Sequence, residues 1–251
     1  MQMRLTPALP AEDWQRLERF LPKGLLARPG ASMLERATGC LAQLVLAHRV
    51  LPGQKIPMDD IAEQIGTSRT PVREALRLLE TEGLVEALPN RGFIVRRLEA
   101  DEVAQLYEAR RCIEPFVAAE ACRKRTAGFL QELRTLHRIY AKLLAGGGDR
   151  RRHGMLVDKA FHVRIAEQAG NAHLTALLAN VFDRLVLTRP LEDFPLGRMA
   201  EAVKEHAHLL AQLESGTPRS VEAAVARNIE NGGAAIIAHM QSTRELAFSA
   251  A

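Results

Sequence analysis

The segment from Asp60 to Arg96 constrains the fold of this chain of 251 residues more than any other. Its first part has the apolar spacing of a short helix, and Gly66 is a typical residue for such a helix to end at. A turn of two residues follows. We predict that a second helix begins at Thr70 or just before it, because the Thr70 hydroxyl can cap a helix and Pro71 suits the first helical position.

One face of this second predicted helix is apolar. Its residues are Val72, Ala75, Leu76 and Leu79. They recur at helical spacing and must face a core, so Arg73 and Arg77 lie off the apolar stripe and point outward. Arg69 stands where the helix begins.

Two strand-like runs follow Gly83, where we expect the second helix to end. The runs are 84–88 and 93–96, and the residues between them, Pro89, Asn90, Arg91 and Gly92, are a hairpin signal. Arg91 would lie at the tip of the hairpin. Helix, turn, helix and hairpin together predict a winged helix-turn-helix.

A helix of this kind fits the major groove of double-stranded DNA. Arg69 and Arg73 are candidates for base or phosphate contacts, since a guanidinium group can bind guanine O6 and N7 with two hydrogen bonds. Ser68 and Thr70 would donate hydrogen bonds to phosphates. The full set of candidate DNA-binding residues is Ser68, Arg69, Thr70, Arg73, Arg77, Arg91 and Gly92. For any single arginine, an ordinary solvated side chain is the alternative interpretation.

Overall charge does not explain DNA binding. Residues 31–98 hold nine Lys or Arg against eight Asp or Glu, so their net charge is only +1, and that of the whole chain is +4. Positioned arginines must therefore direct the binding. The three cysteines, an odd number in helical sequence, suggest reduced thiols. No apolar run approaches the ~18 residues of a membrane span and no signal peptide is evident, so we expect a cytoplasmic, nucleoid-associated protein with no membrane contact.

We expect three regions along the chain. Residues 1–30 form an N-terminal extension with a possible short amphipathic helix at 14–21, for which a partly ordered arm is favoured over a partner-binding helix. The winged helix-turn-helix occupies 31–98. Residues 99–251 have helical periodicity and predict an all-helical bundle, so the chain should be mostly α. Its six predicted helices span 101–123, 127–145, 151–169, 172–188, 197–215 and 218–241.

A charged residue interrupts the apolar face of the first helix in the bundle. The face is formed by Val103, Leu106, Ile113 and Val117, and Arg110 lies in its middle. A buried cation needs a partner. One interpretation is an internal salt bridge with Glu114, one turn further on. The other is that Arg110 binds the carboxylate of a small-molecule effector.

Four further polar residues lie on inward faces of the predicted helices. Asp158 and His162 share one face of the third helix, while His206 and Asn228 lie on the fifth and sixth. Each alone is more often a satisfied core polar group. Together they suggest a polar cavity, and an Asp with two His residues is a plausible set for a divalent metal such as zinc, nickel or manganese.

The recognition-helix text SRTPVREAL at 68–76, with EGLV at 82–85 and RGF at 91–93, resembles the GntR family of bacterial transcription regulators. Leu51-Pro52-Gly53 is similar to a turn of the same domain, so the resemblance covers 31–98. It implies a DNA-binding regulator. Many members carry a basic residue where this chain has Asp59, so the resemblance carries no DNA contact over to that position.

Residues 100–241 resemble the FCD effector domain of the FadR-type branch of that family. The matching text is EAR at 108–110 with Ile113-Glu114, DKAFH at 158–162, Gly170-Asn171 and Glu205-His206. In metal-binding members an Asp and three His residues hold the ion, and an organic acid can complete its shell.

In this chain Asn228 stands where the third His is expected. An amide oxygen is a poorer ligand than imidazole for zinc or nickel, so affinity could fall, the preferred metal could change, or the pocket could be metal-free. His208 should point to another face of its helix and not replace the missing ligand.

These observations predict a ligand-responsive transcriptional regulator rather than an enzyme. We expect a homodimer that binds a pseudo-palindromic operator and responds to a small organic acid held by Arg110. Repression relieved by ligand is the commoner outcome that the resemblance implies, and activation stays open. One alternative is a metal-dependent enzyme in which Asp158, His162 and His206 activate water, although no general base is evident. Another is an architectural DNA-binding protein without an effector.

Overall fold

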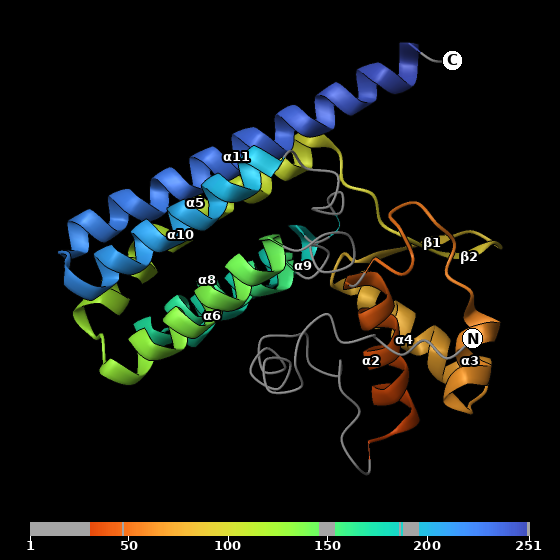
Figure 1. Cartoon of the computed structure of the whole chain (residues 1–251). Coiled ribbons are helices and arrows are strands. Elements are labelled where there is room, and N and C mark those ends of the chain that lie inside the picture. The colour runs from red at the N-terminus through yellow and green to blue at the C-terminus, as the bar shows by residue number, and fades with distance from the viewer. Residues whose placement is uncertain (1–30, 47, 146–153, 186, 188–195, 250–251) are drawn as a thin grey trace. The chain divides into compact units, whose positions relative to one another are not determined.

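The computed structural model describes residues 31–249 except 47, 146–153, 186 and 188–195 (Figure 1). The described residues divide into two compact units. The first unit comprises the described residues up to Leu98 and the few between Asp183 and Leu187. The second unit comprises the other described residues from Glu99 onward. The N-terminal extension expected at 1–30 lies outside the described residues. None of the helices described has the length and apolar character that crossing a membrane requires.

The first unit packs three helices beside a two-stranded hairpin. Its elements are α2 (Met33–Leu46), α3 (Met58–Ile65), α4 (Arg69–Thr81), β1 (Val85–Leu88) and β2 (Gly92–Val95). The strands are antiparallel, with Val85 opposite Val95 and Leu88 opposite Gly92. Helix α2 packs against α3 and α4, and the predicted apolar face of α4 is buried. The winged helix-turn-helix expected from the sequence is therefore the fold of this unit.

The turn between α3 and α4 depends on one glycine. Gly66 ends α3 with φ +69°, in the left-handed region where a side chain is disfavoured. The next helix starts just before Thr70, as predicted, but the assignment of Thr70 as its cap and of Pro71 as its first residue was wrong. Helix α4 begins at Arg69, Ser68 holds the N-cap position without a side-chain cap, and Thr70 is already helical. Pro71 is then the third helical residue, which is tolerated because first-turn N–H groups have no intrahelical partner.

A tight turn closes the hairpin. The Arg91 N–H donates to the Leu88 carbonyl oxygen over 3.0 Å, and Asn90 adopts φ +58°. Pro89 precedes Asn90, and a proline followed by a residue with positive φ is typical of a type II turn. Phe93, the second residue of β2, is buried, so the wing is anchored to the unit's core while Arg91 stays exposed.

The second unit is helical throughout its described part. Its helices are α5 (Ala100–Arg123), α6 (Ala127–Ala145), α8 (Gly154–Ala169), α9 (Ala172–Leu185), α10 (Leu196–Ser215) and α11 (Pro218–Ser249). Helix α5 packs against α8 and α11, and α6 packs against α8 and α10 (Figure 1). Six helices were predicted here. The last continues past the expected end at residue 241, because no Gly or Pro follows to stop it.

Helices α5 and α11 approach closely at a pair of glycines. A Cβ atom added at Gly233 would lie 2.9 Å from Cδ1 of Tyr107, and one at Gly232 would lie 3.4 Å from the Tyr107 hydroxyl. The backbone of α11 therefore rests directly on the Tyr107 ring. This contact fixes one wall of the cavity described below.

Candidate functional site

The predicted DNA-binding residues lie at the start of α4 and at the tip of the wing. Six of the seven are exposed and Gly92 is half-buried; the exposed ones are Ser68, Arg69, Thr70, Arg73, Arg77 and Arg91. Arg73 forms no ion pair with any described residue, so its guanidinium is available to an external anion. The first unit thus presents arginines and hydroxyls on the exposed face of α4.

Arg69 is held by a carboxylate of the preceding helix. Its Nη2 donates to Oδ2 of Asp59 over 2.6 Å, and its Nε pairs with Oδ1 of the same carboxylate. Both side chains are about two-thirds exposed, at 69% and 67%. The sequence did not predict this pair, although Asp59 stood out there as a departure from the family pattern.

Arg77 connects α4 to the wing. Its Nη1 donates to Glu80 over 2.6 Å, and its guanidinium lies 5.3 Å from the centroid of the Phe93 ring. Glu80 also accepts a hydrogen bond from the Ala87 N–H over 3.1 Å, and its hydrogen bond with Arg77 lowers the pKa of the Glu80 carboxyl. Glu80 and Phe93 are therefore partners of Arg77 and not of Arg69 or Arg73, the other two candidate arginines of α4.

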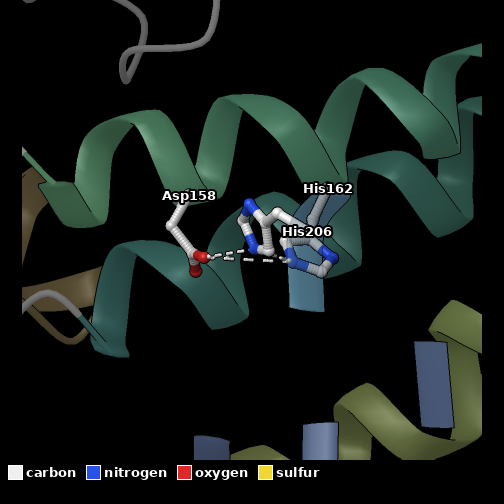
Figure 2. A group of neighbouring side chains, drawn as sticks. All are labelled: Asp158, His162 and His206. Atoms are coloured by element: carbon white, nitrogen blue, oxygen red, sulfur yellow. Dashed lines mark hydrogen bonds and ion pairs between the residues drawn. The ribbon is translucent and has the colours of Figure 1, made fainter. Parts of the chain in front are cut away.

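The second unit brings together three of the four predicted metal ligands (Figure 2). Asp158 Oδ1 lies 3.0 Å from His206 Nε2 and 3.9 Å from His162 Nε2, and the two Nε2 atoms are 3.3 Å apart. Asp158 and His162 come from α8, and His206 comes from α10. Aromatic rings hold the imidazoles in place: Tyr140 and Phe161 each stack on His206 with centroids 4.6 Å apart.

These three side chains fit a divalent metal. Ligand atoms bound tetrahedrally at ~2.0–2.1 Å lie about 3.3 Å apart, close to the separations between Asp158, His162 and His206. Burial lowers the pKa of His206, which favours the neutral imidazole that binds metals. Burial also opposes ionisation of Asp158, but a hydrogen bond from His206 and nearby positive groups hold the pKa of this carboxyl well below its ordinary value.

Glu114 joins the metal-site histidine to the predicted effector-binding arginine. Its Oε1 lies 2.5 Å from Arg110 Nε and its Oε2 lies 2.5 Å from His162 Nδ1. Burial disfavours its charge, yet Arg110 and His162 lower the pKa of Glu114 to about 2. An ionised carboxylate beside Nδ1 places the imidazole proton there and leaves Nε2 free for a metal. The salt bridge with Arg110 had been considered from the sequence, but the contact with His162 had not; a buried metal-ligating histidine generally needs such a partner.

The guanidinium of Arg110 is enclosed by aromatic rings. It lies 4.9 Å from the Tyr107 centroid and 4.4 Å from the Phe182 centroid, and only 3% of Arg110 is exposed. Among the described residues, neither of its terminal nitrogens has a hydrogen-bond partner. Arg110 therefore combines a paired Nε with two unused donor groups.

A cavity that is partly open to solvent adjoins these groups. Its wall includes Tyr107, Arg110, Tyr140, Asp158, Arg198, His206 and Asn228, with apolar residues of α6, α8, α10 and α11. Burial raises the pKa of Tyr107 to about 12 and raises that of Tyr140 as well, so both hydroxyls stay protonated and can donate. Two tyrosines, the buried Arg110 cation, and Asp158 and His206 of the candidate metal site thus line one space.

Asn228 lies on the wall of this cavity but bonds to a different group. Its Nδ2 donates to Glu205 over 3.3 Å, and Asn231 donates to the same carboxylate over 2.8 Å. Arg198 donates two further hydrogen bonds to Glu205, of 3.0 and 2.9 Å. This second carboxylate network was not predicted. His208 is exposed, as expected, and is not part of either network.

The two units together define a class of protein: a DNA-binding domain joined to a helical domain with a polar cavity, the arrangement of a transcriptional regulator. Residues 34–95 match the family described as bacterial regulatory proteins, gntR family, and residues 105–231 match the FCD domain. The chain belongs to the GntR family of transcriptional regulators and carries an FCD domain. This family and the relatives of the chain are regulators, not enzymes.

Two relatives illustrate this similarity. The chain is 32% identical over 189 residues to a probable D-xylose utilization operon transcriptional repressor of Paenarthrobacter nicotinovorans, covering 73% of this chain and 80% of the relative. It is 29% identical over 170 residues to the Nta operon transcriptional regulator of Aminobacter aminovorans, covering 68% and 78%.

Solved structures share the fold. The chain is similar to McbR/YncC of E. coli, with a TM-score of 0.71, 21% identity and coverage of 82% of this chain and 97% of the other. A putative GntR regulator from Rhodococcus sp. RHA1 gives a TM-score of 0.72 with the same identity and coverage.

Proposed function

We propose that this chain is a ligand-responsive transcriptional regulator that binds a pseudo-palindromic operator as a homodimer. In this proposal a small carboxylate, held by Arg110 together with a divalent metal at Asp158, His162 and His206, modulates its affinity for DNA. The single observation that supports this most is the buried Arg110, which has two unpaired terminal nitrogens and lines the same cavity as Asp158 and His206.

The DNA-binding half of the proposal rests on the exposed end of α4. Arg69 and Arg73 would contact bases or phosphates in the major groove, and Ser68 and Thr70 would donate to phosphates. Arg91 and Gly92 would bring the wing to the flanking backbone. Acting on chromosomal DNA would place the protein at the nucleoid in the cytoplasm.

The effector half rests on charge. Arg110 can bind a carboxylate through its terminal nitrogens, and the Tyr107 and Tyr140 hydroxyls can donate to other oxygens of the ligand. Zinc, nickel or manganese, held by the Asp and two His residues, would add positive charge for the same anion. Asn228 supplies no third imidazole, so we expect weaker metal binding than a site with three His residues would give.

Effector binding would act by shifting an equilibrium between two arrangements of the dimer. If these differ tenfold in affinity for the operator, about 1.4 kcal/mol of coupling suffices. We propose repression relieved by the ligand as the direction of this effect, consistent with the name of the Paenarthrobacter relative.

DNA recognition is tested by selecting a duplex from a random library with the wild-type protein. Arg69→Ala should weaken binding to the selected duplex and relax base preference, whereas Arg97→Gln, a charge change at another exposed arginine, should mostly alter the salt dependence. Fluorescence anisotropy measures both. Unchanged specific binding by the Arg69→Ala protein would refute the assignment of α4 to the groove.

Effector binding is tested by thermal shift. The panel comprises sugar acids, amino acids, fatty acyl compounds and dicarboxylates, each with and without zinc, nickel or manganese. We expect at least one carboxylate to raise Tm more in the presence of metal than in its absence. If metal analysis finds no stoichiometric ion and no acid shifts Tm, the effector proposal is wrong while DNA binding stands.

A further inference from the structure

We propose that Asp59 is a positioning residue for DNA recognition: it fixes one edge of the Arg69 guanidinium so that the opposite edge reads a base, and its charge disfavours phosphate at that place. The inference rests on the proposed function, because it assumes that Arg69 contacts DNA. It adds a determinant of specificity from α3, outside the recognition helix.

The two side chains are anchored on rigid elements at a fixed separation. Asp59 lies in the first turn of α3, where the helix N-terminus favours a negative charge. Arg69 is the first residue of α4. The short turn that starts at Gly66 joins the two helices, so both backbones are set before DNA arrives.

The contact leaves a specific part of Arg69 free. The Asp59 carboxylate takes the edge of the guanidinium formed by Nε and Nη2. The remaining edge, formed by Nη1 and the second hydrogen of Nη2, has no partner among the described residues. Two parallel donors on one edge match guanine O6 and N7. A guanidinium held by its other edge loses less rotational freedom when it makes that contact.

The charge of Asp59 works in the same direction. Non-specific DNA binding depends on neutralising phosphates, and a carboxylate bound to Arg69 cancels its charge where a phosphate would otherwise approach. Asp59 should therefore weaken binding to any sequence while preserving the contact with the correct base. Because the net charge over residues 31–98 is only +1, specificity for a DNA sequence depends on local charge pairs such as Asp59 and Arg69.

The test compares Asp59→Asn with Asp60→Asn. Both residues are exposed in the first turn of α3 and the substitutions change the charge equally, but Asp60 makes no hydrogen bond or ion pair with Arg69 or with any other side chain among the described residues. Each protein is titrated by fluorescence anisotropy against two duplexes, the one selected from a random library by the wild type and a shuffled duplex of the same composition, at several salt concentrations.

We expect Asp59→Asn to lower the ratio of selected to shuffled affinity about fivefold, the upper range for one exposed ion pair. Affinity for the shuffled duplex should rise and its salt dependence should steepen. Asp60→Asn should raise both affinities alike and leave the ratio unchanged. In an Arg69→Ala background, Asp59→Asn should no longer alter the ratio.

Three results would overturn the inference. The first is an equal ratio for the Asp59→Asn and Asp60→Asn proteins. The second is an effect of Asp59→Asn that persists in the Arg69→Ala background, which would mean that Asp59 contacts a base itself. The third is a higher ratio for Asp59→Asn. Failure of wild-type protein to select any duplex, or an Arg69→Ala protein with full specificity, would instead refute the proposed function.

Discussion

Glu114 contacts two buried groups that the proposed function depends on. One of its carboxylate oxygens contacts Arg110 and the other contacts His162, and 2% of the residue is exposed. A buried carboxylate between two such groups is stable only while both remain, because removing either leaves a charge or a donor unpaired. Arg110, the proposed anion-binding residue, and His162, a proposed metal ligand, are thus oriented by a single side chain.

Replacing Glu114 by Gln should lower metal affinity by about 10- to 100-fold, the usual effect of removing a carboxylate behind a ligating histidine. Isothermal titration calorimetry with zinc or nickel measures the change, and circular dichroism checks the fold. Glu120→Gln is the matched control, since Glu120 lies on the same helix and pairs only with Arg123 and Lys124 among the described residues. A folded Glu114→Gln protein with wild-type metal affinity would contradict this role.

Asn228→His should raise metal affinity at least about tenfold, because imidazole is a better ligand than an amide for zinc or nickel. Asn231→His is the control: Asn231 is one turn away on α11 and donates to the same Glu205 carboxylate, but it does not line the cavity. Competition with a chromogenic chelator compares the proteins. Equal gains for both substitutions would show that any added histidine binds metal, irrespective of the cavity.

The sequence predicted Asp158, His162 and His206 as neighbours because each polar residue interrupts an apolar stripe that must face the core. It could not predict the partners of those residues. Glu114 falls on the same stripe as Arg110, but only the packing of α5 against α8 brings it to His162. Asn228, which the sequence placed at a polar cavity, lines the cavity in the structure, while its bond to Glu205 depends on the rotation of α10 against α11.

At the scale of the elements, the contact of α11 with α5 should be sensitive to substitution. Gly233→Ala would place a methyl group 2.9 Å from the Tyr107 ring, so the ring or the helix must move. We expect a loss of about 1–3 kcal/mol in the free energy of unfolding, as for other overpacked sites. Urea denaturation measures it.

Gly128→Ala is the matched control for this prediction. A Cβ atom added at Gly128, in α6, would meet no other atom within 4 Å, and alanine favours helix more than glycine does. Its substitution should leave stability unchanged or raise it by up to about 1 kcal/mol. If Gly233→Ala behaves in the same way, α11 does not rest on Tyr107 in solution.

Helix positions were largely readable from the sequence, but the residue that caps α4 and the end of α11 were not. Apolar periodicity located all six helices of the second unit and both helices around Gly66. The start of α4 was predicted correctly, but its cap was not, because a threonine followed by proline looks like a cap, whereas here Thr70 and Pro71 both lie inside the first turn. Backbone hydrogen bonding of the first turn, which the sequence does not express, decides between these arrangements.

At the scale of the whole molecule, the proposed homodimer makes a geometric prediction about DNA. Two recognition helices related by a twofold axis require two half-sites in fixed phase. Inserting about five base pairs, half a helical turn, at the centre of the selected duplex should reduce affinity to that of a single half-site. Anisotropy titration measures the loss, and an insertion outside the half-sites is the control. Unchanged affinity would mean that the two half-sites are not read together.

The cavity is bordered by two carboxylate networks that share no hydrogen bond among the described residues. In the first network Glu114 accepts a hydrogen bond from Arg110. In the second, Glu205 accepts hydrogen bonds from Arg198, Asn228 and Asn231. An engineer building a biosensor on the proposed effector site could therefore vary Arg198, which lines the cavity, to change which inducer is accepted, while the anchoring chemistry around Glu114 is left intact. Selectivity and retention of the inducer would then be separately adjustable.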